Sequence, residues 1–264
     1  MVIDFHTHIF PDKIAEKTIE TLKGRSRLLA FTDGTLAGAL RSMDFAGVDR
    51  SVVLSIATNA RQNKNVNDFA IELDKNERIT AFGSVHPEAD WKYELDRLSD
   101  AGIRGIKLHP DYQGFYIDAE NMRPIYEYIL KKGFILSFHA GLDLGLPEPM
   151  HAPVERIARV MDMFCGERVV LAHMGGFMEN EAVREKLLGR DIYIDTSFAP
   201  LYMPPSEYSA MLSAHRADRL LFATDLPWSS QAKSIELVKN ADIPEETKEK
   251  ILYKNALALL GLKA

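Results

Sequence analysis

The chain has 264 residues and a formal net charge of −6 at pH 7. Hydrophobic residues make up 46% and charged residues 27%, a mixture typical of a globular protein and sufficient for a sizeable core. No cluster of Lys and Arg suggests nucleic acid as a partner, and no apolar run of 18 or more residues predicts a membrane-spanning helix. The length is close to that of one α/β barrel, so we expect a single domain over residues 1–264 that acts on a small-molecule substrate.

The N-terminal residues predict a strand, without the basic segment and small-residue cleavage site of a secretory signal. We therefore expect a cytoplasmic protein. Cys165, the only cysteine, lies in a helix-like segment, where we expect a small buried hydrophobe rather than a nucleophile. The sequence leaves open whether two barrels pair into a homodimer.

Eight short runs rich in β-branched residues alternate with amphipathic segments. The runs end near His8, Ala57, His86, His109, His139, His173, Ser197 and Asp225. After the first interval the ends lie about 23 to 34 residues apart, the length that a strand, a helix and two loops require. This pattern predicts a (β/α)8 TIM barrel. The alternative, a doubly wound open sheet, usually has a glycine-rich first turn, which is absent here.

The segments between the runs predict helices at 35–47, 65–76, 91–102, 122–133, 154–164, 180–189, 205–216 and 243–262. Three longer connections, at residues 10–30, 141–153 and 199–206, follow the first, fifth and seventh runs. Loops on this side of a barrel usually surround the active site, so we expect these three segments to form the walls of a pocket.

Histidines gather at the ends of the predicted strands. Six of the eight, His6, His8, His86, His109, His139 and His173, occupy these positions. In the first run, Asp4, His6 and His8 alternate, which places them on one face of a strand, where burial without partners would be costly. With Asp225 and Lys107, the barrel mouth would offer imidazole and carboxylate ligands for a divalent metal, and Asp4 could orient one of the histidines from behind.

With these residues, the chain resembles the amidohydrolase superfamily of metal-dependent barrel hydrolases. The resemblance spans nearly the whole chain and rests on the ordered set Asp4, His6, His8, His139, His173 and Asp225. The segments GIKLHP, FHAG, AHMGG and ATDLPW look like the branch that contains decarboxylases of aromatic acids and many uncharacterised hydrolases.

The resemblance implies that His6, His8, His139 and Asp225 hold one metal ion, and that His173 acts as a base or as a ligand of a second ion. In binuclear members, a lysine at the position of Lys107 is carboxylated and bridges two ions, whereas many relatives in this branch use one ion and lack it. Because a dication repels a bare ammonium, Lys107 is expected to face a substrate carboxylate, lose its proton or be carboxylated. We expect one or two ions, zinc first, with manganese, iron or nickel as alternatives.

For several further residues, the sequence allows two interpretations of their role. His109 lies on the same face as Lys107 and is predicted to bind substrate, although filling a turn before Pro110 is the alternative. Asp195 either bonds within the barrel mouth or supports the barrel. His86 and Trp228 are candidates for turn packing or substrate contact. Residues 61 and 64, an Arg and a Lys, either meet an anionic substrate or are solvated charges.

A divalent ion lowers the pKa of bound water from about 15.7 to roughly 7, so the first expected activity is hydrolysis of an amide, lactone or ester carbonyl. Asp225 would transfer the proton, and His173 would stabilise the oxyanion. The alternative is non-oxidative decarboxylation of a small aromatic or unsaturated acid, with His173 or Asp225 protonating carbon. A nuclease is disfavoured because nucleases of similar barrel type carry Glu where this chain has Lys107. A purely structural metal site would leave His173 and Lys107 without a role.

Overall fold

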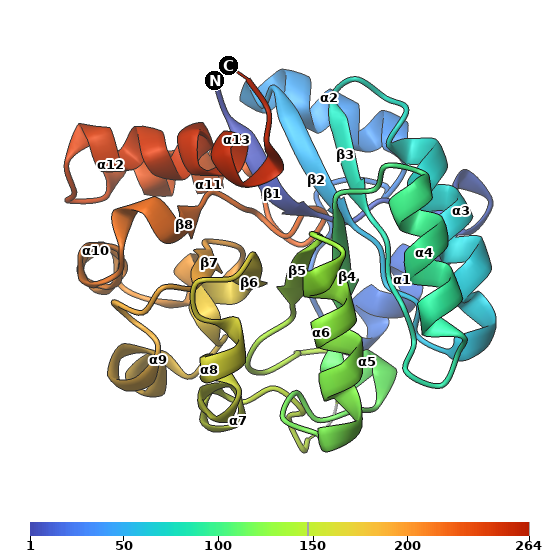
Figure 1. Ribbon diagram of the computed structural model, residues 1–264. Coiled ribbons are helices and arrows are strands. Elements are labelled where there is room, and N and C mark those ends of the chain that lie inside the picture. Colours follow the sequence, from blue (N-terminus) through green and yellow to red (C-terminus); the bar gives the residue numbers. More distant parts are fainter. Residues whose placement is uncertain (147, 264) are drawn as a thin grey trace.

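The computed structural model describes residues 1–146 and 148–263, and within them eight short parallel strands close into a barrel (Figure 1). The strands are β1 (Ile3–Thr7), β2 (Arg50–Leu54), β3 (Ile79–Phe82), β4 (Gly105–Leu108), β5 (Ile135–Phe138), β6 (Val169–Leu171), β7 (Tyr193–Asp195) and β8 (Leu220–Leu221). Strands β1–β3 and β4–β8 form two hydrogen-bonded groups. Parallel bridges from Gly83 to Ile106 and from Thr7 to Leu226 join them. The predicted (β/α)8 TIM barrel is confirmed.

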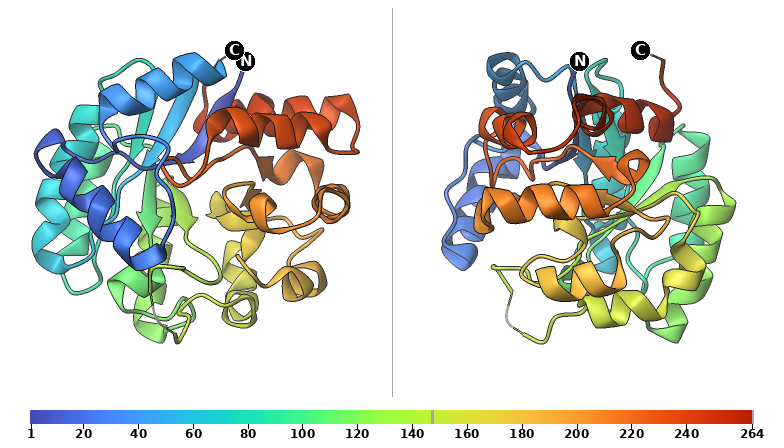
Figure 2. Two further views of the ribbon diagram at one scale, coloured as in Figure 1. Left: turned by 180° about the vertical axis from the view of Figure 1, so that it is seen from behind. Right: turned by 90° about the vertical axis from the view of Figure 1, so that its left-hand side faces the viewer.

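Helices cover the outside of this barrel (Figures 1 and 2). They are α1 (Asp12–Ser26), α2 (Leu36–Ala46), α3 (Asn63–Leu73), α4 (Trp91–Asp100), α5 (Pro110–Gln113), α6 (Arg123–Lys131), α7 (Val154–Arg159), α8 (Met161–Phe164), α9 (Asn180–Lys186), α10 (Pro205–Ala214), α11 (Gln231–Asn240), α12 (Glu245–Glu249) and α13 (Asn255–Leu260). A π-helical turn, Lys250–Lys254, joins α12 to α13. Across the described ranges, none of the helices has both the length and the hydropathy needed to cross a bilayer.

Helix α1 is the largest difference from the predicted elements. Residues 10–30 were expected to be a loop, yet they contain this 15-residue helix. Only Ala15 and Ile19 of α1 are buried. The apolar residues Ile14, Ala15, Ile19 and Leu22 nevertheless recur at helical spacing, so the sequence does contain a signal for this helix, which was overlooked.

The strands also end earlier than predicted. β2 ends at Leu54 rather than near Ala57, and β6 ends at Leu171 rather than at His173. His109, His139 and His173 therefore lie in the first residues after their strands. The predicted helix over residues 154–164 divides into α7 and α8 at residue 160, whose φ of −107° and ψ of 5° leave the helical region.

The interior of the barrel is apolar at the end that lies away from the histidines. Its core consists of Ile3, Phe5, Val52, Leu54, Phe82, Ile135, Val170, Leu221 and Ala223, which form one cluster with Ala256, Leu257, Leu259 and Leu260 of α13. The C-terminal helix thus packs against the inner strand residues. Polar groups are left to gather at the carboxyl ends of the strands, where this architecture places its chemistry.

A bulge interrupts the polar pattern of the first strand. The pairing of β1 with β2 shifts register between Asp4 and Thr7, and such an irregularity breaks the alternation of faces. The Asp4 carboxylate accepts hydrogen bonds from Thr224 Oγ1 (2.6 Å) and from Gln231 Nε2 in α11 (2.8 Å). Asp4 also accepts the backbone N–H of His6 at 3.3 Å, but the His6 and His8 rings are held by Asp195 and by the Leu54 carbonyl, so Asp4 does not orient either ring as predicted. Asp4 instead links β1 to α11, and burial raises its pKa to about 7.

Gly141 connects the loops that carry two of the histidines. It follows His139, has a φ of +81° and forms a parallel bridge with Phe177, in the loop after His173. A Cβ at this position would collide with the backbone nitrogen and oxygen of Phe177. The two loops can approach this closely because residue 141 has no side chain.

Gly141→Ala is expected to destabilise the protein by about 3 kcal/mol or more, because backbone overlap adds to the usual cost of a positive φ. Urea denaturation measures the change in the free energy of unfolding. Gly114→Ala is the matched control, since Gly114 has a φ of +68° but an added Cβ there would meet no atom within 4 Å. Its expected cost is only about 1 kcal/mol. Equal losses in the two variants would contradict the close approach at Gly141.

Candidate active site

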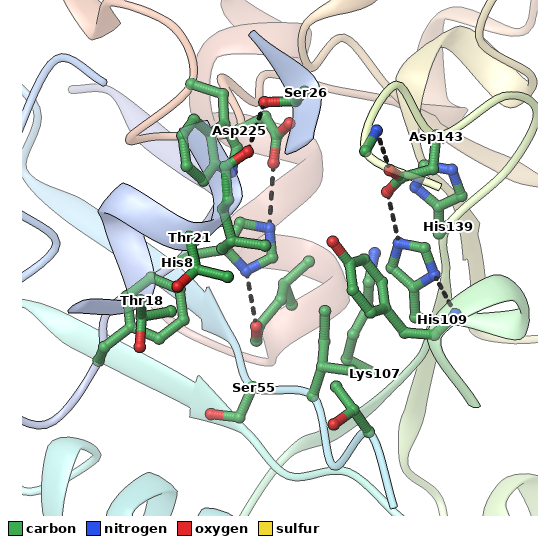
Figure 3. A pocket seen from close by; sticks show the side chains of 18 of the residues that line it. His8, Thr18, Thr21, Ser26, Ser55, Lys107, His109, His139, Asp143 and Asp225 are labelled. Atoms are coloured by element: carbon green, nitrogen blue, oxygen red, sulfur yellow. Dashed lines mark hydrogen bonds and ion pairs between the residues drawn. The ribbon is translucent and has the colours of Figure 1, made fainter. Parts of the chain in front are cut away.

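A cavity of about 670 Å³ lies at the carboxyl ends of the strands (Figure 3). This volume falls in the range of about 300–1,000 Å³ that is common for small-molecule sites. Much of its lining is apolar and includes Ile9, Phe10, Ile14, Leu22, Leu54, Ile56, Val66, Phe69, Leu142, Phe177, Phe198 and Trp228. Residues from 10–30 and 141–153 line it as predicted, whereas none of the described residues in 199–206 does.

Three side chains meet at one edge of the cavity. His6 Nε2 and His8 Nε2 are 3.2 Å apart, and each faces Asp225 Oδ1, at 3.3 Å and 3.0 Å. Donor atoms that share an ion at about 2.1 Å, at angles between octahedral and tetrahedral, are separated by about 3.0–3.4 Å. The three atoms therefore have the spacing of ligands to one divalent cation.

The hydrogen bonds behind these rings fix which nitrogen has the lone pair. His8 Nδ1 lies 2.9 Å from the carbonyl oxygen of Leu54, so it is protonated and donates to that oxygen. His6 Nδ1 donates in the same way to Asp195 Oδ2 at 2.9 Å. Both Nε2 atoms consequently present lone pairs to each other and to Asp225. Three acceptors in contact repel one another, and a cation between them would remove this repulsion; the donor set fits a divalent metal.

Asp195 and Ser197 form a second layer behind the rings. Asp195 is fully buried, and its Oδ1 accepts hydrogen bonds from the backbone nitrogen of His173 (3.0 Å) and from Ser197 Oγ (2.5 Å). Ser197 Oγ also lies 2.8 Å from His173 Nδ1. Of the two interpretations left open for Asp195, the structure places its carboxylate against His6. Ser197 was recognised only as the end of a strand.

His139 does not join the three-donor cluster. The described donor groups place it with His109 and Asp143 instead, and its Nδ1 lies 3.1 Å from His173 Nε2. Its Nε2 is buried and has no hydrogen-bond partner among the described residues. Three members of the predicted four-ligand set are thus brought together, and His139 offers a free nitrogen elsewhere in the same cavity.

His109 uses both ring nitrogens within the protein. Nε2 donates to Asp143 Oδ2 at 3.2 Å, and Nδ1 accepts the backbone N–H of Tyr112 at 3.3 Å. Its ring stacks on His139 with an interplanar angle of 12°. Because both ring nitrogens of His109 are already engaged, His109, His139 and Asp143 offer fewer free lone pairs to an ion than the three-donor cluster does. A contact between His109 and substrate stays a prediction.

Lys107 is a buried lysine of the cavity lining. Its side chain is 1% exposed, and its Nζ has no hydrogen bond to any of the described residues. Burial lowers the pKa of Lys107 to about 8, against the attraction of Asp195 and Asp225. In Figure 3 it lies among the lining side chains, with His8 and Asp225 on one side and His109 on the other. A desolvated amine here would be stabilised by an anionic ligand.

Burial also shifts the other titratable groups. It lowers the pKa values of His6, His139 and His173 well below their usual range, which favours the neutral rings that can ligate a metal. Burial raises the pKa of Asp225, although His8 opposes this shift. The Asp225 carboxyl therefore takes up a proton more readily than an exposed aspartate does.

Of the remaining candidate residues, one lines the cavity and the others lie outside it. Trp228 lines the cavity, whereas Arg61 and Lys64 are absent from its described lining, and Lys64 pairs with Asp68 at 2.6 Å. His86 is buried outside the cavity lining and accepts the backbone N–H of Glu88 at 3.3 Å. Residues of α1 line the cavity, as expected for the segment 10–30, although the helix itself was not predicted.

The family model described as amidohydrolase matches residues 3–262. The chain belongs to the amidohydrolase family. This match confirms the resemblance drawn from the sequence. None of the curated proteins matches the sequence.

Several solved barrel structures are similar to this chain over nearly its whole length. An uncharacterised TIM-barrel protein from Bordetella bronchiseptica has 20% identity and a TM-score of 0.78, covering 98% of this chain and 99% of its own. The 2,6-dihydroxybenzoate decarboxylase from Rhizobium has 17% identity and a TM-score of 0.68, covering 98% of each chain.

The 5-carboxyvanillate decarboxylase from Novosphingobium aromaticivorans, solved with manganese and a nitrobenzoic acid, has 16% identity and a TM-score of 0.71. The alignment covers 99% of this chain and 96% of that one. With sequence identities of 16–20%, these three similarities show that the barrel fold is shared.

Proposed function

We propose that this protein is a metal-dependent carboxy-lyase, which releases CO2 from a small carboxylic acid with a planar, apolar body. The observation that carries the proposal is the buried amine of Lys107, which has no hydrogen-bond partner in the described part of the chain and lies inside a largely apolar cavity. A carboxylate is the simplest ligand group that would pair with this amine. Two of the solved structures that resemble the chain are named decarboxylases of aromatic acids, which supports this choice.

His6, His8 and Asp225 would hold the divalent ion, and His139 Nε2 offers a further lone pair in the same cavity. Manganese and zinc both suit nitrogen and carboxylate donors, and manganese is the ion named with one of the similar structures. When bound, the ion supplies positive charge that binds the acid and withdraws electrons from it. Lys107 would hold the carboxylate from the other side and orient the bond to be broken.

The reaction needs one proton and no oxidant. The bond between the carboxylate carbon and the substrate body breaks, its electron pair stays on the body, CO2 leaves, and a proton takes its place. Asp225 would be the proton source, because only its Oδ1 contacts the histidines and its second carboxylate oxygen is left to face the cavity. His173 is less suited, since Ser197 and His139 engage both of its ring nitrogens.

The sequence alone favours hydrolysis, and the cavity and the comparisons favour the alternative reaction. Hydrolysis requires an ordered water, whereas an apolar wall makes a bound carboxylate less solvated and its loss as neutral CO2 easier. Apolar side chains from α1 and from the loops after β2 and β5 form much of this wall. We therefore place decarboxylation first and retain ester, lactone or amide hydrolysis as the competing outcome.

A paired substrate test separates the two reactions. Protein loaded with Mn²⁺ or Zn²⁺ is incubated with a panel of hydroxylated aromatic acids and, separately, with esters, lactones and amides. We expect CO2 release from an acid, one deuterium at the vacated carbon in D2O, and loss of the activity after chelation with recovery on adding the ion. Hydrolysis of a neutral substrate with ¹⁸O uptake from water, and no CO2 from any acid, would overturn the proposal.

A further inference from the structure

Two residues at the carboxyl end of β7, Asp195 in the strand and Ser197 just after it, contact the histidines on the side away from the cavity. Asp195 and Ser197 are both fully buried, and neither lines the cavity. We propose that this carboxylate and this hydroxyl set the ring tautomers of His6, His173 and His139, so that His6 and His139 keep their Nε2 lone pairs free. The inference rests on the proposed ion site but not on the reaction assigned to it.

The first branch runs from Asp195 to His6. Asp195 Oδ2 lies 2.9 Å from His6 Nδ1, and a carboxylate only accepts, so the ring proton resides on Nδ1. The opposite tautomer would put an N–H at Nε2, 3.2 Å from His8 Nε2 and 3.3 Å from Asp225 Oδ1. That proton would occupy the position of the ion. Asp195 thus keeps a ligand atom available without contacting the ion itself.

The second branch runs from Asp195 through Ser197. The Ser197 hydroxyl has one proton, and the 2.5 Å contact with Asp195 Oδ1 uses it. Ser197 Oγ must then accept from His173 Nδ1–H at 2.8 Å. His173 Nε2 becomes an acceptor for His139 Nδ1–H at 3.1 Å. This order of donors leaves a lone pair on His139 Nε2, the buried atom that has no partner within residues 1–146 and 148–263.

The surroundings of Asp195 prevent the carboxylate from turning. Its Oδ1 also accepts the backbone N–H groups of His173 and Ser197, each at 3.0 Å. Three donors therefore converge on one oxygen, and His6 contacts the other. In Asp195→Asn, the amide oxygen would stay with the three donors, and the NH2 group would face His6 Nδ1. A donor at that position forces His6 into the Nε2–H tautomer.

The test measures tautomers and ion affinity rather than turnover. Histidine-labelled, metal-free protein is studied by ¹⁵N NMR of the ring nitrogens, and Mn²⁺ affinity is measured by competition with a chelator. The variants are Asp195→Asn and Ser197→Ala. Ser234→Ala is the matched control, because Ser234 is a buried serine of α11 that lies outside the cavity.

We expect Asp195→Asn to move the His6 proton to Nε2 and to raise the Kd for Mn²⁺ by about 10–100-fold. Ser197→Ala removes a contact of 3.2 Å between Ser197 Oγ and His6 Nδ1, but the shorter Asp195 contact of 2.9 Å remains, so we expect the His6 proton to stay on Nδ1. The tautomers of His173 and His139 are expected to mix, and Mn²⁺ binding to weaken less. Ser234→Ala should match the unmodified protein. Unchanged ring tautomers in both variants, or a Kd for Asp195→Asn equal to that of the control, would overturn the inference. A failed search for decarboxylation would leave these results untouched.

Discussion

Asp225→Asn is expected to lower kcat/KM for CO2 release by about 10³-fold or more, and to weaken the binding of the divalent ion. The substitution removes the negative oxygen that faces His6 and His8, and it also removes the proposed proton source. Loss of a positioned acid alone costs about 10²–10⁴-fold. Steady-state kinetics with the substrate found in the panel, together with metal analysis, measures both effects.

The control is Asp218→Asn, since Asp218 precedes the same strand but its side chain is 51% exposed and paired with Arg216 and Arg219. It should retain full activity and ion content. If Asp225→Asn kept both the bound ion and near-normal turnover, neither role assigned to Asp225 would hold.

Lys107→Met is expected to reduce kcat/KM for the acid by about 10²–10³-fold, while ion content is preserved. Methionine fills the same volume without the charge, so the substrate carboxylate loses a buried ionic partner. Truncating one member of such a pair costs about 2–5 kcal/mol, and each 1.4 kcal/mol is about tenfold. The measurement is kcat/KM together with the dissociation constant of an unreactive carboxylate inhibitor.

The pH dependence gives this prediction a second readout. Because burial lowers the pKa of Lys107 to about 8, the amine is charged below that pH and loses its proton as the pH rises through it. Inhibitor affinity should therefore fall above about pH 8 in the unmodified protein and lack this fall in Lys107→Met. Lys64→Met, at a side chain that is 74% exposed, is the control. Equal inhibitor affinity in the Lys107 and Lys64 variants would contradict the carboxylate contact.

The barrel and the ion cluster could be predicted because each depends on a regular feature of the chain. Parallel strands in a barrel bring their carboxyl ends together, so the positions of His6, His8 and Asp225 in the sequence were sufficient to place them side by side. The resemblance to the amidohydrolase superfamily also implied His139 as a fourth ligand. The orientation of its ring depends on the contact with His173, which no strand pattern specifies.

Other features depend on local irregularities or on long-range partners. The bulge in β1 directs Asp4 toward α11, and a two-residue period cannot show a shift of register. Ser197 has a role only because Asp195 and His173 approach it in the folded chain. Helix α1 is a different case, because its apolar residues Ile14, Ala15, Ile19 and Leu22 recur at helical spacing and could have revealed it.

Helix α1 lines the cavity but buries few residues in the core, so substrate selectivity could change there without altering the histidines that would hold the ion. Ile14, Thr18, Thr21 and Leu22 face the ligand space, but the helix contributes only Ala15 and Ile19 to the buried interior. Exchanging residues on its inner side would alter which molecules fit, at little cost to folding and without disturbing the histidines. This segment is thus the natural place to redesign selectivity, or for evolution to have diversified it.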